Sequence, residues 1–179
     1  FRFYNTLADC TDDSTFVGGT TKGTIALAAG VAHPSDAAAG LTAGHYAFKA
    51  RYNGDSNNNA VVSSCEDFNI TTLTINKLAN GGNDTFGYTV TGPTNASPSI
   101  LTSGTPGTGS ITIQVLPGSY TVGETTIPSG WNLVGLTCNG NSPELGPTSS
   151  PFNVPAGQNT VCDFENTKGG ATRTQGFWG

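Results

Sequence analysis

Four cysteines are the residues of this 179-residue chain whose type and spacing point most directly to chemistry. They are Cys10, Cys65, Cys138 and Cys162, and no two of them have the C-x-x-C spacing of a zinc site. An even number of cysteines in a chain with few charges indicates disulfides formed in an oxidising compartment. The alternative is four reduced cysteines buried in a core.

The two histidines give no indication of catalysis. His33 and His45 have no serine or cysteine at the spacing of a nucleophilic motif, and they lie far from the two later cysteines. No glycine-rich loop stands between a predicted strand and a predicted helix, where it would bind phosphate. We therefore predict that the chain is not an enzyme, holds no metal and needs no cofactor.

The composition is that of a protein made of short strands and turns. The chain has 25 Gly and 10 Pro, and only 11% of its residues are charged. Threonine and valine favour strands, whereas glycine, proline and asparagine favour turns, so we predict an all-β fold. The net charge is −5 and the seven Lys and Arg are scattered, which excludes a nucleic-acid-binding protein. No apolar run approaches the ~18 residues of a membrane span, so we expect no membrane insertion of this segment.

Alternating apolar residues divide the chain into two segments. In the first, about residues 1–70, alternation predicts strands at the start of the chain, at 24–28, at 45–52 and at 61–70. Residues 37–44 are predicted to form a loop rather than a helical turn, because glycine closes the stretch. The chain does not begin with Met, and we expect it to be part of a longer precursor.

The second segment, about residues 71–168, has the more regular pattern. Alternation predicts strands at 73–77, 86–90, 111–115, 120–124, 133–138, 152–154 and 160–166. Together the segments predict two small β-sandwich modules in tandem, followed by an extended tail or linker at 169–179. Each segment contains two cysteines, so of the three pairings that four cysteines allow we predict Cys10–Cys65 and Cys138–Cys162.

The first segment resembles bacterial immunoglobulin-like repeats. The resemblance rests on Leu-Thr-Ala-Gly-His-Tyr-Ala-Phe-Lys-Ala-Arg-Tyr-Asn-Gly-Asp-Ser-Asn-Asn at residues 41–58 and on the placement of Cys10 and Cys65. Domains of that family normally have further strands before a segment such as residues 1–7. The resemblance therefore implies a partial sandwich that lacks its N-terminal strands, and exposed strand edges invite pairing with another chain.

The second segment resembles the prealbumin-like, Cna-B/SpaA-like domains of microbial surface adhesins and pilins. The matching stretches are Leu-Thr-Ile-Asn-Lys at 73–77, Pro-Gly-Ser-Tyr-Thr-Val-Gly-Glu-Thr at 117–125, Pro-Ser-Gly-Trp at 128–131 and Cys-Asp-Phe-Glu-Asn-Thr-Lys at 162–168. Their order and spacing follow the family across nearly the whole segment.

This resemblance implies an internal isopeptide bond between Lys77 and Asn166, assisted by Glu124. The strand alternation is consistent with it, since each of the three residues shares its parity with apolar neighbours. Burial disfavours the charged form of lysine, lowers its pKa and makes the amine nucleophilic, while a buried Glu can polarise the Asn amide and relay protons. The alternatives are ordinary surface residues at strand ends, or a plain Lys–Glu ion pair.

Other candidate sites lie in loops and in the tail. Asn69, Asn83 and Asn95 begin N-glycosylation sequons, although several such sequons arise by chance in a chain rich in Thr and Asn. The tail ends in Phe177-Trp178-Gly, and we interpret it either as a linker or as a strand that pairs with the open edge of a neighbouring copy. In the second case Phe177 and Trp178 would anchor the assembly contact.

Three functions follow, all of them extracellular or at the cell surface. The leading hypothesis is a non-catalytic structural subunit of a surface filament or stalk that assembles head to tail with copies of itself by strand donation. The second is an adhesin module that binds glycans on exposed aromatics such as Trp131 or Trp178. The third is an accessory region of a secreted hydrolase.

Overall fold

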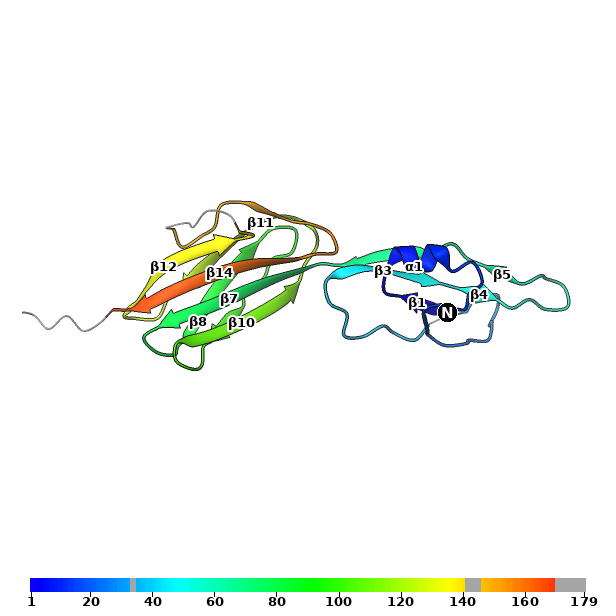
Figure 1. The fold of residues 1–179 in the computed structure, drawn as a ribbon, viewed down its shortest axis with the longest axis horizontal. Coiled ribbons are helices and arrows are strands. Elements are labelled where there is room, and N and C mark those ends of the chain that lie inside the picture. Colours follow the sequence, from blue (N-terminus) through cyan, green and yellow to red (C-terminus); the bar gives the residue numbers. More distant parts are fainter. Residues whose placement is uncertain (33–34, 141–145, 170–179) are drawn as a thin grey trace, which may run out of the picture. The chain divides into compact units, whose positions relative to one another are not determined.

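A computed structural model describes residues 1–32, 35–140 and 146–169 of the chain. The chain divides into two compact units, one from Phe1 to Ile70 and one that begins at Thr71. Strands dominate both units, which confirms the prediction of an all-β protein (Figure 1). Each unit has its own buried core.

Unit 1 is an antiparallel sheet with one short helix. Its elements are β1 (Arg2–Tyr4), α1 (Leu7–Asp12), β2 (Thr20–Thr21), β3 (Gly44–Lys49), β4 (Arg51–Tyr52), β5 (Val61–Val62) and β6 (Glu66–Ile70). Four strands form one sheet in the order β2-β1-β3-β6, and β4 pairs with β5 in a two-stranded ladder. The strands β2 and β6 are the edges of the four-stranded sheet.

The four-stranded sheet of unit 1 has two different faces. Tyr4 and Ala47 are paired neighbours on one face, where they form a small buried cluster with Cys10 of α1. The alternate residues, among them Phe3, Phe48 and Phe68, place a group of stacked and tilted rings on the other face. The buried core of this unit is therefore small, and it centres on the disulfide-bonded Cys10.

Three strand boundaries predicted for unit 1 are wrong. Residues 24–28 form no strand, and Ala28 makes only an isolated bridge to Val31. The strand predicted at 61–70 is interrupted between β5 and β6, and that at 45–52 is divided into β3 and β4. Residues 37–43 form no helix, as predicted. Helix α1 was not predicted, although Thr6 caps it by accepting a hydrogen bond from the Asp9 amide.

Unit 2 is a sandwich of two four-stranded sheets. Its strands are β7 (Thr72–Asn80), β8 (Thr85–Thr91), β9 (Ser99–Leu101), β10 (Gly107–Gln114), β11 (Gly118–Thr126), β12 (Trp131–Cys138), β13 (Phe152–Val154) and β14 (Asn159–Lys168). One sheet has the order β10-β7-β14-β12 and the other β13-β11-β8-β9. All seven strands predicted in this segment are present, whereas the three-residue β9 was not predicted.

The first and last strands of unit 2 lie side by side in the centre of one sheet. They are β7 and β14, and they form the parallel pair of a sheet whose other pairs are antiparallel (Figure 1). Their inward residues alternate with partly or fully exposed residues, most of them polar, as a sheet with one buried face requires. The buried core packed between the two sheets includes Leu73, Ile75, Phe86, Val122 and Phe164.

Candidate functional site

Strands β7 and β14 bring a lysine and an asparagine together inside the sandwich. Lys77 lies opposite Phe164 in the parallel ladder, and Asn166 lies opposite Ala79, one inward position further along. The alternation that buries Ile75 and Phe164 also turns Lys77 and Asn166 into the core. Lys77 is 2% exposed and Asn166 is fully buried.

The facing sheet contributes a carboxylate to the same place. Glu124 lies on β11, which pairs with β8 so that Glu124 is opposite Tyr88. Its side chain points into the core although the register of the ladder shifts just beyond it, between Glu124 and Thr126. The three residues predicted from the sequence therefore meet in one buried cluster.

The three side chains form a closed ring of hydrogen bonds. The Lys77 Nζ donates to Glu124 Oε1 at 2.6 Å and to Asn166 Oδ1 at 2.5 Å. The Asn166 Nδ2 donates to Glu124 Oε2 at 3.0 Å. One carboxyl group thus holds the amine on one oxygen and the carboxamide nitrogen on the other.

Burial governs the electrostatics of this cluster. The Lys77–Glu124 pair has no side-chain exposure, and the cost of removing both charges from water is large. Desolvation lowers the pKa of Lys77, and the hydrogen bond to Glu124 opposes that shift in part. The Lys77 amine lies over the face of the Phe86 ring, 4.1 Å from the ring centroid. Transfer of one proton within the pair leaves a neutral amine beside a carboxylic acid.

The arrangement has the components of an amide exchange. A neutral Lys77 amine is a nucleophile, and the Asn166 carboxamide is an electrophile with a nitrogen that can leave as ammonia. The Glu124 carboxyl contacts both nitrogens, so it can take a proton from one and give a proton to the other. The isopeptide chemistry expected from the sequence is therefore geometrically accessible.

Sequence reasoning missed two aromatic residues of the cluster. Phe86 and Tyr88 come from β8, and the Tyr88 hydroxyl lies 3.4 Å from Glu124 Oε1. The signal was present, because a tyrosine with the parity of buried Phe86 and Val90 has a hydroxyl that needs a partner in the core. Alternation indicates which way a side chain points, but it does not identify its partner on the facing sheet.

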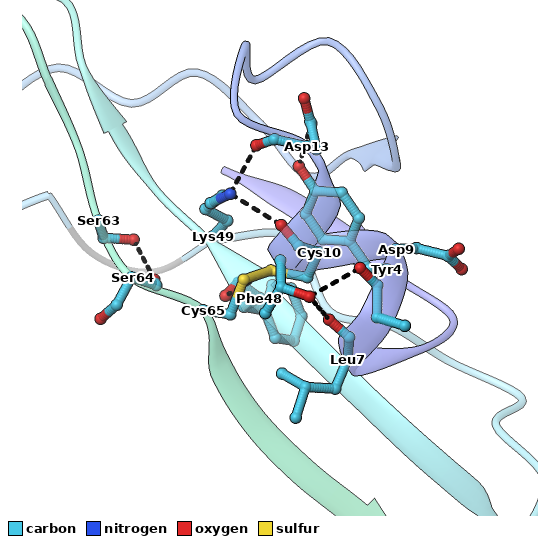
Figure 2. Close-up of a disulfide and its surroundings, with 12 residues drawn as sticks. Tyr4, Leu7, Asp9, Cys10, Asp13, Phe48, Lys49, Ser63, Ser64 and Cys65 are labelled. Carbon is cyan, nitrogen blue, oxygen red and sulfur yellow. Dashed lines mark hydrogen bonds between the residues drawn. A yellow bond between two sulfur atoms is a disulfide. The ribbon is translucent and has the colours of Figure 1, made fainter.

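The structure contains both disulfides of the predicted pairing. Cys10 of α1 bonds Cys65, which lies just before β6, and Figure 2 shows this bond with its surroundings. Close by, the buried Lys49 amine donates to the main-chain oxygens of Cys10 and Asp13. In unit 2, Cys138 and Cys162 are directly opposite each other on β12 and β14.

The remaining candidates lie elsewhere. Asn69, Asn83 and Asn95 are exposed. Trp131 is 5% exposed and its indole N–H donates to Asp84, so the expectation that it offers an exposed platform for glycans is wrong. Phe177 and Trp178 lie outside the described residues.

The described residues contain neither a metal-binding cluster of side chains nor a membrane-spanning helix. No three His, Cys, Asp or Glu side chains within residues 1–32, 35–140 and 146–169 gather as they would around a metal ion. Within the same ranges, no helix has the length and apolar character needed to cross a bilayer.

Comparison with known proteins identifies the second unit. A model of the SpaA_4 family, a prealbumin-like fold domain, matches residues 73–168, which is more than half of the chain. Among solved structures, the chain is similar to the pilus-presented adhesin Spy0125 (Cpa), solved as a cysteine-to-alanine mutant. The sequence identity is 16%, the TM-score is 0.33, and the match covers 64% of this chain and 35% of that one. No curated protein matches the chain. The family match begins at residue 73, so the immunoglobulin-like character of residues 1–70 stays a prediction.

Proposed function

Because the chain belongs to the SpaA_4 family of prealbumin-like fold domains, we propose that it is a non-catalytic structural subunit of an extracellular surface filament or stalk. Within unit 2, Lys77 and Asn166 form an isopeptide bond. The observation that carries this proposal is the buried ring of hydrogen bonds among Lys77, Glu124 and Asn166. Two disulfides fit an oxidising, extracellular environment.

The bond forms by exchange of one amide for another. The neutral Lys77 Nζ attacks the Asn166 Cγ, and the Glu124 carboxylic acid gives its proton to Nδ2. Glu124, now a carboxylate, takes a proton from the attacking nitrogen, the bond between Cγ and Nδ2 breaks, and ammonia leaves. The new bond joins Nζ to Cγ, and Glu124 ends in its starting protonation state. No oxidant, reductant or cofactor is consumed.

The position of the bond suits a protein that carries tension. The chain enters unit 2 at β7 and its last described strand is β14, and these strands are parallel neighbours. Pulling on the two ends of the unit would shear this ladder. With a bond from Lys77 to Asn166, tension would pass directly from one strand to the other. The chain between these two residues, which are 89 positions apart in the sequence, would not be stretched. The Cys138–Cys162 disulfide lies inside the protected part.

Intact-mass measurement tests the bond. We expect the reduced and alkylated wild-type chain to be lighter than its sequence by about 17 Da, the mass of one ammonia. A tandem mass spectrum should show a branched peptide that joins Lys77 to Asn166. Glu124→Gln should keep the unmodified mass, because the proton relay is lost. Lys49→Met changes the other buried lysine and should keep the deficit, so it is the matched control. An unmodified wild-type mass rejects the bond.

Head-to-tail assembly is the second part of the proposal. The tail of one copy pairs with a free edge of the unit 1 sheet of the next, where β6 presents a five-residue edge strand. A contact between two different surfaces does not close on itself and so builds a filament.

Electron microscopy tests this assembly, and images of the purified chain should show polymers. A chain that ends at Gly169, or Phe177→Ala with Trp178→Ala, should give monomers, and polymers from these variants would contradict strand donation by the tail.

Glycan binding is the alternative role, and one groove favours it. A hollow of about 670 Å³ on the outer face of the β7-containing sheet is lined by Asn76, Asp163 and Glu165, with Gly109 and Gly135 beside them. Carboxylate and amide groups of this kind hydrogen-bond sugar hydroxyls. A glycan array with the wild-type chain tests this role, and Asp163→Ala with Glu165→Ala should abolish any signal that arises from the groove.

A further inference from the structure

The Glu124 carboxyl has one partner that takes no part in the proposed exchange. Among the described residues, three groups donate hydrogen bonds to it: the Lys77 amine, the Asn166 carboxamide and the Tyr88 hydroxyl. The amine becomes an amide nitrogen during the reaction, and the carboxamide nitrogen leaves. Of the three donors, only the phenol keeps its chemical identity from start to finish.

From this geometry we propose that Tyr88 is a positioning residue for isopeptide formation, holding the Glu124 carboxyl in the orientation that bridges the two nitrogens. This inference rests on the proposed function, because it assumes that the bond forms. Among the described residues, the Tyr88 hydroxyl hydrogen-bonds Glu124 and neither Lys77 nor Asn166, so Tyr88 acts through Glu124.

The backbone and the core fix Tyr88 in place. It lies opposite Glu124 in the β8–β11 ladder, so the distance between the two residues is set by main-chain pairing. Its ring packs edge-on against Phe164 with 5.0 Å between centroids, and the residue is 2% exposed. The hydroxyl lies at the outer limit of a hydrogen bond to Oε1, the oxygen that also receives the lysine amine. When the amine leaves Oε1 to attack carbon, the phenol remains to hold that oxygen.

A phenol suits both protonation states of the carboxyl. It donates to a carboxylate, and it accepts from a carboxylic acid, so it can stay bonded while Glu124 gains and loses a proton. Burial, followed by the charge of Glu124, raises the pKa of Tyr88, which keeps the phenol protonated at neutral pH. The titratable groups that meet here are Lys77 from β7, Glu124 from β11 and Tyr88 from β8. Glu165 on β14 also acts on Lys77 through its charge.

Tyr88→Phe tests the inference, and Tyr120→Phe is its matched control. Tyr120 is buried in the same core, but its hydroxyl bonds the main chain of Leu116 and Thr94 instead of the cluster. Each chain is purified unfolded from inclusion bodies and refolded by dilution. Samples are quenched in acid and weighed to follow the loss of ammonia, while fluorescence reports folding separately.

We expect Tyr88→Phe to fold at the wild-type rate but to form the bond at least about fivefold more slowly, the effect of losing one buried hydrogen bond. Its dependence of rate on pH should also be displaced, a readout that loss of packing alone does not move. Tyr120→Phe should match the wild type in both. A wild-type rate and pH profile in Tyr88→Phe would overturn the inference while leaving the bond itself established.

Two further outcomes are decisive. If Tyr88→Phe does not fold, difluorotyrosine introduced at position 88 preserves the ring and strengthens the phenol as an acid. It should change the rate and its pH profile, and an unchanged profile overturns the inference. If the wild-type chain itself loses no ammonia, the proposed bond fails, and this inference fails with it.

Discussion

Each unit of the protein holds one buried lysine and one disulfide, but the two lysines have different partners. In unit 1 the Lys49 amine donates to the main-chain oxygens of Cys10 at 2.8 Å and Asp13 at 2.6 Å (Figure 2). In unit 2 the Lys77 amine faces a carboxylate and a carboxamide. The exposed fractions are similarly low, 7% and 2%, so burial does not distinguish the two lysines.

The partners decide what a buried lysine does. Cys10 lies in the last turn of α1 and Asp13 follows it as the C-cap, so Lys49 satisfies carbonyls that the end of a helix leaves without an intrahelical partner. Peptide carbonyls accept hydrogen bonds from the Lys49 amine without reacting with it. Neither of these two hydrogen bonds brings a carboxyl group to the amine. Lys77 has both an electrophile and a proton relay within hydrogen-bonding distance. A reactive lysine therefore requires the whole set of partners and not only a dry environment.

The cores differ as well. Unit 2 buries a continuous apolar core between two sheets, whereas the buried cluster of unit 1 consists of Tyr4, Cys10 and Ala47 with Cys65 against it. A small core supplies little stability by itself, so the disulfide and the Lys49 hydrogen bonds carry more of the stability of unit 1.

Removal of the buried lysines should lower the free energy of unfolding more than any other change predicted here, and by different amounts in the two units. Lys77→Met eliminates the proposed covalent link, worth about 4–5 kcal/mol for a loop of this length. Lys49→Met should cost unit 1 only about 1.5–3 kcal/mol, the loss of hydrogen bonds from a charged donor. Calorimetry of the whole chain should resolve a transition for each unit. Equal losses in the two variants would contradict the distinction between the lysines.

Removal of each disulfide should give a smaller effect with the opposite asymmetry. Cys10→Ala with Cys65→Ala opens a link across a sequence separation of 55 residues, worth about 4 kcal/mol, and we expect unit 1 to unfold. Cys138→Ala with Cys162→Ala opens a separation of 24 residues within a unit that the proposed isopeptide bond and the larger core would still hold. Limited proteolysis with mass detection should therefore show cleavage within residues 1–70 in the first variant and a protected unit 2 in the second. Cleavage of unit 2 in the second variant would show that its crosslink does not substitute for the disulfide.

The sequence predicts unit 2 much better than unit 1, for a physical reason. Every long strand of unit 2 buries one face against the facing sheet, so alternation marks each strand and turns Lys77, Glu124 and Asn166 inward. The distances in the cluster, and the contact with Tyr88, depend on how the two sheets pack. Alternation within one strand contains no information about that packing.

In unit 1, tertiary contacts override local pattern. Helix α1 has only six residues, too few to show a helical period, and its Thr6 cap, its disulfide and Lys49 hold it in place. Residues 24–28 alternate like a strand but pair with no neighbouring strand. A strand needs a partner as well as a pattern, and partners are set by non-local contacts.

Acid should lower the stability of unit 1 more than that of unit 2, and this is the smallest of the differences predicted between the units. The Tyr4 hydroxyl at 2.7 Å, aided by the Val17 and Gly18 amides, holds the pKa of Asp13 below its ordinary value of 3.8. A carboxyl with a lowered folded-state pKa adds stability above the unfolded value, and this stability is lost as the pH falls below about 4. Unit 1 should therefore weaken in acid. The proposed isopeptide bond would persist at every pH in this range, so acid should affect unit 2 less.

Asp13→Asn measures how much the Asp13 carboxyl contributes to the pH dependence of the stability of unit 1. The carboxamide does not titrate, so the stability of unit 1 should be lower at pH 7 than in the wild type and should vary less between pH 5 and pH 2. Urea unfolding of the whole chain at several pH values, with proteolysis to assign each transition, measures both. Asp55→Asn is the comparison within the unit, because Asp55 has a pKa lowered to about 2 by Tyr52 but lies in the loop between β4 and β5, away from the buried cluster. If Asp55→Asn flattens the pH profile and Asp13→Asn does not, the acid sensitivity of unit 1 arises in that loop and not at the helix that the disulfide and Lys49 hold.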